Sequence, residues 1–569
     1  MSDRVEFRCN GEAVTLAVEA GESLLSVLRE RLGVTSAKDG CAPQGQCGCC
    51  TVLVDGTPRV ACVTPVARVA GRSVTTLEGL DAGDRARLAE AFVATGGAQC
   101  GFCTPGIAMR CFATFGESAG SREAVGRALA GHVCRCTGYE SIFAAVEGSA
   151  NPTGRRDLDA AGRRATLEGG APQRVTVGVA LGAALFADDT APRDALVAVP
   201  LPLGSSADAV HAAGNRWVVG ESLFEARAQA AKIQGRRTTI GVRPPIPPVA
   251  PPVGGVALAT SWVEPAYLEP DASWCHPGGE PASPLGNGGA FGGKATSAAP
   301  AAARELADRL GRTVRVVYSR EDVVRLGPKR PPVSATAIAT GSGASIEGQV
   351  ATPGLDACRD PLTWPYAIDV HERWDGADLD GPRVSSELRA AGWAERVVLL
   401  EGALDEAGVD RAELHRDDRA AATALDVCVR APSGALAGAR VSIDGSTGAL
   451  GGVDVVVAAG DPLDEVVLRS YAVGAVHMAL GWVFTEGLAV DDDGEILDLT
   501  MRSFGVIRAK HTPPISVRVL DDPGPPLAAA DAVFAATAAA AWNAVARVEG
   551  ARPVSFPAFD TRAARALRR

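Results

Sequence analysis

Residues 40–56 read GCAPQGQCGCCTVLVDG and place three candidate ligands, Cys41, Cys47 and Cys50, on one short loop that also contains Cys49. A fourth, Cys62, follows a strand-like stretch. Three thiolates on one loop and a fourth further along are typical of plant-type [2Fe-2S] ferredoxins, although here five residues rather than four separate the first two cysteines. The glycines of the loop let backbone N–H groups turn towards the sulfides. We therefore predict that these four cysteines, the first cysteine group, bind one [2Fe-2S] cluster.

Two other interpretations of the first cysteine group stay open. Four thiolates also suit a tetrahedral zinc ion, and the four residues could be unrelated free cysteines. Eleven of the 14 cysteines lie before residue 140, and in a reducing cytosol such density favours metal binding over disulfides. Cys49 is interpreted as a small packing residue.

Two further pairs, Cys100 with Cys103 and Cys134 with Cys136, form the second cysteine group. Both pairs lie where predicted helices begin or end, and the helix N-terminal amides near residue 105 would favour an anionic cluster. Alone, two cysteine pairs could bind zinc; together with the first group they predict a second [2Fe-2S] cluster. Cys111 is expected to be a buried helix residue.

Hydrophobic periodicity predicts an α+β multidomain chain. A hairpin over 3–20 with a turn at Asn10-Gly11, a helix over 23–32 and a strand over 51–54 suggest a β-grasp ferredoxin domain, residues 1–80. A four-helix domain (81–148) and a polar linker (149–172) should follow. The expected helices of that domain are 86–94, 106–114, 121–129 and 139–147. Later expectations are strands at 175–179, 196–199 and 313–318, helices at 223–233, 297–310 and 528–547, and a proline-rich connector at 244–252.

Charge and hydropathy exclude some partners. The net charge of −11 argues against nucleic acid, which needs a basic surface. We find no apolar run long enough for a membrane helix and no signal-peptide core at the N-terminus, so we expect a cytoplasmic protein without membrane contact.

Three strings resemble the iron–sulfur part of the xanthine dehydrogenase/aldehyde oxidoreductase family of molybdenum hydroxylases. They are the stretch at 40–56, QCGFCTPGIAM at 99–109 and CRCTGYESI at 134–142. The resemblance implies two [2Fe-2S] clusters and a molybdopterin cofactor, in its cytosine dinucleotide form. The plant-type cluster would face an outside acceptor, and the other would lie beside the pterin, near Cys136.

The remaining chain is similar to the molybdenum-binding part of that family in patches. GGAFGGK at 288–294, here named the Gly-rich loop, looks like the loop beside molybdenum, and the resemblance implies cofactor contacts from this loop. It also implies a first molybdenum-side, hammerhead-like domain at 173–255 and a shortened molybdopterin-binding-like domain at 256–569. The implied cofactor-binding residues are Gly288, Gly289, Phe291, Gly292 and Gly293.

The chain departs from the family in two places. We find no Arg-Gly-Phe-Gly string in the middle portion, which is nearly absent. Gly524 stands where the family has its catalytic glutamate, and glycine cannot take a proton. Asp531 is the nearby acid that could replace it, although a solvated or early-helix acid is the simpler interpretation.

Two functions follow as hypotheses. The first is a molybdenum hydroxylase that hydroxylates an aldehyde or N-heterocycle and passes electrons through two clusters to a separate flavoprotein or ferredoxin. The second is an iron–sulfur electron carrier whose C-terminal region is degenerate and free of molybdenum. A homodimer is compatible with both.

Overall fold

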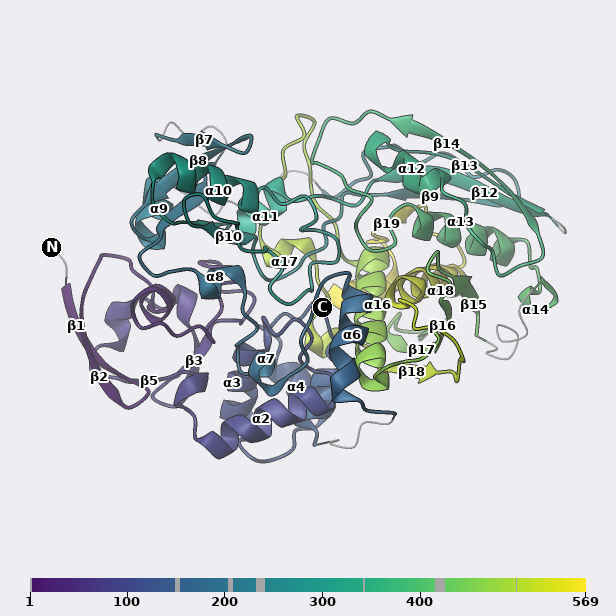
Figure 1. The fold of residues 1–569 in the computed structure, drawn as a ribbon. Helices are drawn as coiled ribbons and strands as arrows, with labels where there is room; N and C mark the ends of the chain where they lie inside the picture. Colours follow the sequence, from purple (N-terminus) through teal and green to yellow (C-terminus); the bar gives the residue numbers. More distant parts are fainter. Residues whose placement is uncertain are drawn as a thin grey trace.

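The computed structural model describes residues 3–148, 154–202, 208–231, 241–340, 343–414, 425–497 and 499–568. In these residues the chain forms four sheets with helices packed between and around them (Figure 1). The N-terminal sheet lies at one side of the molecule, and the long strands β12, β13 and β14 lie at the opposite side.

The N-terminal domain is a five-stranded sheet with the order β2-β1-β5-β3-β4. Asn10 and Gly11 have φ values of 53° and 89°, as a tight hairpin turn requires, so the predicted hairpin is confirmed. Ser23 caps the helix that follows it by accepting a hydrogen bond from the N–H of Ser26. The elements are β1 (Asp3–Cys9), β2 (Glu12–Val18), β3 (Thr51–Val54), β4 (Thr57–Val60), β5 (Ser73–Thr75), α1 (Leu24–Ser26) and the π-helical turn η1 (Val27–Arg31). The short 3₁₀ turns are η2 (Ala61–Val63), η3 (Val66–Val69) and η4 (Leu77–Gly79).

Four helices follow, as predicted, and lie below the centre of Figure 1. They are α2 (Ala82–Ala94), α3 (Thr104–Phe115), α4 (Arg122–Ala128) and α5 (Glu140–Val146). Cys103 is the N-cap residue of α3, with Pro105 in its first turn, and Cys134 and Cys136 precede α5. The helical domain therefore brings the two cysteine pairs to helix ends.

The segment predicted as a polar linker, 149–172, contains a helix, α6 (Leu158–Gly169). Asp157 caps it, and Ala160, Ala161 and Ala165 are buried against the protein. This alanine stripe is narrow and polar residues surround it, so the helical period is weak in the sequence. Residues 149–153 lie outside the described residues.

The second sheet, with the order β10-β11-β6-β8-β7, crosses the domain boundary predicted at 255/256. β10 and β11 come after that boundary, yet β11 pairs in parallel with β6.

The prediction of a strand at 175–179 is wrong, because Thr176 caps a short helix there, α7. The predictions at 196–199 and 223–233 match β6 and α9, although residues 232 and 233 lie outside the described part. The elements are α7 (Val177–Ala180), α8 (Ala187–Thr190), β6 (Leu196–Pro200), β7 (Val210–Ala212), β8 (Asn215–Gly220), α9 (Leu223–Gln229), β10 (Ala272–Cys275), α10 (Ala299–Leu310) and β11 (Val314–Val317).

The C-terminal part contains the third sheet, β14-β13-β12-β9-β19, and the fourth, β15-β16-β17-β18. Its strands are β9 (Gly255–Thr260), β12 (Val333–Thr340), β13 (Gly343–Ala351), β14 (Asp369–Ala377), β15 (Val427–Arg430), β16 (Leu436–Ile443), β17 (Leu450–Ala458), β18 (Ile515–Val519) and β19 (Ser555–Phe556). Its helices are α11 (Arg320–Leu326), α12 (Leu355–Arg359), α13 (Trp393–Glu406), α14 (Arg411–Leu414), α16 (Glu465–Phe484), α17 (Met501–Phe504), α18 (Ala530–Glu549) and α19 (Arg562–Arg568), with 3₁₀ turns η5 (Thr352–Gly354) and η6 (Ala509–His511). The alanine-rich helix predicted at 528–547 is α18.

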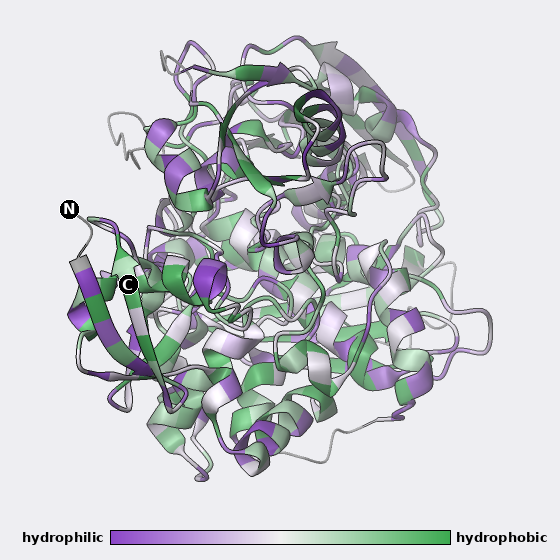
Figure 2. Cartoon of the chain, turned by 60° about the vertical axis from the view of Figure 1, so that its left-hand side comes forward, coloured by the Kyte–Doolittle hydropathy of each residue, from purple (hydrophilic) through white to green (hydrophobic). Residues whose placement is uncertain are grey.

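Helices α16 and α18 form the centre of the C-terminal part, where Trp482 stacks on Phe534 at 5.3 Å. The expectation that no apolar run is long enough for a membrane helix is wrong for α16, which by length and hydropathy could cross a membrane. However, 94% of its most apolar window is buried inside the protein. Figure 2 shows hydrophobic segments in the interior and hydrophilic ones mainly along the outer ribbons. Helix α16 thus has the surroundings of a core helix.

Lys329, between α11 and β12, is fully buried, and its side-chain Nζ donates a hydrogen bond to the carbonyl of Gly327. Burial, with the nearby Arg320 charge, lowers the pKa of Lys329 to about 7 from 10.5. Between pH 7 and pH 10.5 the Lys329 amine is therefore protonated in the unfolded chain and neutral in the folded chain. The free energy of unfolding therefore rises with pH from about 7 to 10.5.

Replacing this cation should remove that pH dependence. We expect Lys329→Met to be more resistant to urea than the parent protein at pH 7, because no charge is then buried. The advantage should shrink by a few kcal/mol as pH rises to 10. Urea midpoints from pH 7 to 10 measure it, with the exposed Lys510→Met as the matched control. An advantage that stays constant with pH would contradict the prediction.

Candidate functional site

The first cysteine group is gathered by the loop 41–50 and by the turn η2. The thiol of Cys41 contacts those of Cys47 and Cys62, and the thiol of Cys62 also contacts that of Cys50. The Sγ of Cys41 accepts the N–H groups of Gln46 and Cys47, both at 3.3 Å. These thiol and N–H contacts hold the pKa of Cys41 well below its ordinary value. The arrangement therefore favours a thiolate at Cys41, the form that binds metals, whereas contact with Cys41, together with burial, raises the pKa of Cys47 and of Cys62.

The second cysteine group consists of two thiol pairs. The Sγ atoms of Cys100 and Cys136 are 3.4 Å apart, and the thiol of Cys103 contacts that of Cys134. Thr137 Oγ1 lies 3.1 Å from the Sγ of Cys134. Contact with the Cys103 thiol, followed by Thr137, lowers the pKa of Cys134 to about 7. Two adjacent pairs are the arrangement in which each iron of a [2Fe-2S] cluster would take two thiolates.

The contacts between the thiols bear on the choice between a single zinc ion and a binuclear cluster. In the second group the thiols meet two by two, Cys100 with Cys136 and Cys103 with Cys134. Tetrahedral zinc needs four ligands around one point, whereas a binuclear cluster accepts thiolates spread over two. Seven of the eight thiols are buried and that of Cys100 is half-buried.

The two cysteine groups lie next to each other. A Cβ placed on Gly106, in the first turn of α3, would lie 2.9 Å from the Cα of Cys49, so the first loop packs directly on the start of that helix. Cys49 itself is fully buried, in agreement with its interpretation as a packing residue, and interacts electrostatically with Cys41 and Cys100. Cys111 is also buried, as expected. The structure thus places Cys49 between both groups.

The Gly-rich loop covers the second cysteine group. Gly289 has φ +83°, and a Cβ there would lie 2.8 Å from the Cβ of Cys100 and 3.5 Å from the Sγ of Cys136. Any side chain at this position would push the loop off the cysteines. Of the predicted cofactor-binding residues, Gly289 therefore faces the thiols directly, and Gly288 packs against the side chain of Gln173. Phe291 and Gly292 instead contact residues 387–389, and Gly293 packs against Tyr267.

A second loop, which the sequence did not predict to be part of the site, lies beside Phe291. Residues 389–392, Arg-Ala-Ala-Gly, turn with φ +53° at Ala390 and +87° at Gly392. The N–H of Arg389 donates to the carbonyl of Phe291, and its guanidinium lies 5.0 Å from the ring of that residue. The sequence of this turn shares the arginine and the final glycine with the Arg-Gly-Phe-Gly string that the sequence lacks. Two residues are too weak a signal to find in a sequence.

Asp531, the proposed replacement for the catalytic glutamate, is already engaged. It lies in the first turn of α18, 3.2 Å from the Nε of Arg389, and accepts the N–H of Ala390. Gly524 is exposed, with no atom within 4 Å of where its Cβ would be. The structure therefore ties Asp531 to the turn 389–392, and its catalytic role stays a prediction.

Two buried ion pairs occupy the interior behind the Gly-rich loop. Arg135 binds Glu486 through both nitrogens at 2.5 and 2.7 Å, and Arg330 binds Glu395 at 2.5 and 3.0 Å. Burial raises the pKa of Glu486, and the Arg135 charge opposes this shift. Bidentate pairs of this kind satisfy both partners and hold them in one geometry.

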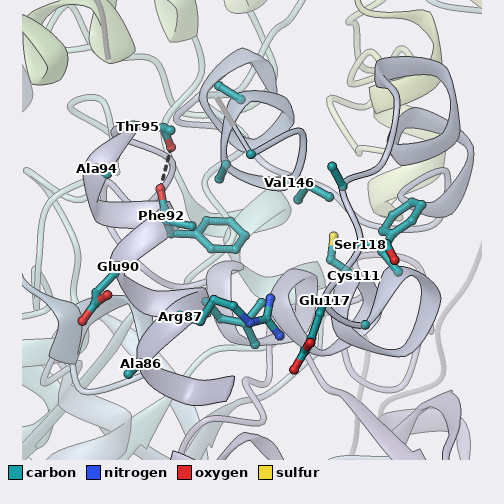
Figure 3. Close-up of a pocket in the computed structure, with 18 of the residues that line it drawn as sticks. Ala86, Arg87, Glu90, Phe92, Ala94, Thr95, Cys111, Glu117, Ser118 and Val146 are labelled. Carbon is teal, nitrogen blue, oxygen red and sulfur yellow. Dashed lines mark hydrogen bonds between the residues drawn. The ribbon is translucent and has the colours of Figure 1, made fainter. Parts of the chain in front are cut away.

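A cavity of about 530 Å³ lies elsewhere, between α2, α3 and α5. Figure 3 shows Phe92 and Val146 among its lining residues, together with Cys111. None of the eight cysteines in the two groups lines it. A smaller cavity of about 250 Å³ borders Cys62 of the first group.

Comparisons with known proteins agree with this geometry. A family described as "[2Fe-2S] binding domain" matches residues 76–147. The nicotinate dehydrogenase small FeS subunit of Eubacterium barkeri is 38% identical over 144 residues, 25% of this chain and 91% of that subunit. The xanthine dehydrogenase iron-sulfur-binding subunit of Escherichia coli is 41% identical over 149 residues, again 25% of this chain and 91% of that subunit.

The fold of the whole chain is also shared. The aldehyde oxidoreductase of Desulfovibrio gigas superposes with a TM-score of 0.78 over 100% of both chains, at 15% sequence identity. That of Desulfovibrio desulfuricans gives 0.73, at 16% identity, over 99% of this chain and 100% of that one. At such identities the likeness shows the fold alone, and it confirms the α+β multidomain architecture. With the matches to the iron–sulfur subunits, it shows that this chain belongs to the xanthine dehydrogenase/aldehyde oxidoreductase family of molybdenum hydroxylases, which are oxidoreductases.

Proposed function

We propose that this chain carries electrons, one at a time, through two [2Fe-2S] clusters, one in each cysteine group. The observation that carries the proposal is the pairing of the thiols, with Cys100 3.4 Å from Cys136 and Cys103 in contact with Cys134. The contact between the first loop and the start of α3 supports it, because it brings both groups close together. One-electron carriers placed so closely can exchange electrons through the protein.

A separate flavoprotein or ferredoxin is the proposed electron partner, and it would approach the first cysteine group. The cavity of about 250 Å³ beside Cys62 supports an approach of the partner from this side of the molecule. Pro43 and Phe224 also line it, so apolar atoms flank the cysteine. A homodimer and a cytoplasmic location remain predictions.

Hydroxylation of an aldehyde or N-heterocycle has less support. That reaction needs a base within hydrogen-bond reach of the reacting group. Gly524 has no side chain for this task, and Asp531 is held by Arg389. We therefore favour electron transfer over hydroxylation as the activity of this chain, and the cytosine dinucleotide cofactor stays a prediction.

Loss of one ligand tests the second cluster. We expect Cys103→Ala to lower the iron content from about four to about two atoms per chain and to remove one of two electron paramagnetic resonance signals after reduction. Cys111→Ala, a buried cysteine of α3 outside both groups, should leave iron and spectra unchanged. Equal iron content in the two variants would contradict the assignment.

The contact of the Gly-rich loop with the second cluster can be tested separately. We expect Gly289→Ala to shift the reduction potential or the resonance of the second cluster and to leave the first unchanged, because the added methyl group would meet Cys100. Gly278→Ala is the matched control, since Gly278 also has positive φ, +69°, but no atom lies within 4 Å of its Cβ position. Identical spectra in both variants would place the loop away from the cluster.

A further inference from the structure

Five thiols, rather than four, lie in contact at the first cysteine group. The thiol of Cys47 contacts that of Cys41 on one side and that of Cys49 on the other. The contacts continue from Cys41 through Cys62 to Cys50, so all five thiols form one unbroken series. Cys49 is buried, with 1% of its surface exposed. A fifth sulfur atom is therefore within reach of a predicted cluster ligand.

The thiol of Cys49 is held more loosely than other buried thiols of the chain. It donates a hydrogen bond of 3.9 Å to the carbonyl of Cys47. The Sγ of Cys275, by comparison, lies 3.2 and 3.3 Å from two backbone carbonyls, and that of Cys358 lies 3.6 Å from one. Because a thiol is a weak donor and this bond is long, exchanging the carbonyl for another partner costs Cys49 little.

The backbone of Cys49, in contrast, is fixed from two sides. Gly48, the residue between Cys47 and Cys49, has φ +73°, and a Cβ there would lie 2.4 Å from the ring of His132. On the other side, a Cβ on Gly106 would lie 2.9 Å from the Cα of Cys49. The Cα of Cys49 is thus held between the first loop and α3, and rotation of the side chain moves its sulfur relative to that of Cys47.

We propose that Cys49 is a reserve ligand of the first cluster, able to bind the iron that Cys47 binds when the sulfur of Cys47 is missing. The proposal rests on the proposed function for the presence of this cluster. As Cys49 binds, its S–H proton passes to water, an Fe–S bond forms in place of the bond to Cys47, and the oxidation state of the iron does not change.

The second cysteine group shows no such reserve in the described part of the chain. Its thiol contacts join Cys100 with Cys136 and Cys103 with Cys134, all four of which are predicted ligands. The two groups should therefore respond differently to the loss of one cysteine.

Iron content and electron paramagnetic resonance of three variants test the proposal. We expect Cys47→Ala to keep about four iron atoms per chain and both resonance signals, with the first signal altered by the new ligand. Cys62→Ala, the matched control in the same group, and the double variant Cys47→Ala/Cys49→Ala should each hold about two iron atoms and lose the first signal.

Two results would overturn the proposal. One is the loss of the first signal in Cys47→Ala while the second signal persists. The other is a full iron content in the double variant, because three thiolates would then suffice for the cluster. A parent protein with well below about four iron atoms per chain would instead contradict the proposed function, so the two failures are distinguishable.

Iron release keeps the proposal testable if Cys47→Ala does not fold. We expect a chelator to abolish the first resonance signal several-fold faster in Cys49→Ala than in Cys111→Ala, since a ligand that dissociates can no longer be replaced. Cys111→Ala also removes a buried thiol, from α3, but one outside both groups. Equal rates in the two variants would overturn the proposal.

Discussion

Eight thiol groups drawn into the protein interior are the constraint on which the rest of the structure depends. A buried thiolate is unfavourable unless hydrogen-bond donors or cations compensate for its charge. The first loop supplies backbone N–H groups to Cys41, and a threonine hydroxyl lies beside Cys134. The first loop and the turn before α5 hold these donors beside the thiols.

The C-terminal part packs around the second cysteine group through glycines. Gly289 of the Gly-rich loop lies against Cys100, and Gly474 of α16 lies against the backbone of Cys136. Backbones approach this closely only where no Cβ intervenes. The iron–sulfur part and the C-terminal part therefore share one continuous interior, and the buried helix α16 lies at the boundary between them.

The ion pairs of this interior also hold it in one arrangement. Arg135 with Glu486 and Arg330 with Glu395 are buried, and removing one partner from such a pair typically costs about 3–5 kcal/mol because the other is left uncompensated. Met478 and Trp482 pack between them. These two ion pairs and the side chains between them thus fix the geometry of the interior beside the Gly-rich loop.

The sequence by itself determined the features that depend on short spacing: the hairpin turn at Asn10-Gly11, the four helices of the second domain and the two cysteine motifs at helix ends, Cys100 with Cys103 and Cys134 with Cys136. Each follows from local backbone geometry or from a motif of a few residues. Only the tertiary structure decided that 158–169 is a helix, that β11 joins β6, and that the turn 389–392 lies on Phe291. It also decided that Cys100 contacts Cys136 and that Arg330 pairs with Glu395 in the interior. These contacts join residues far apart in the chain, and they depend on packing volume, which no local pattern encodes.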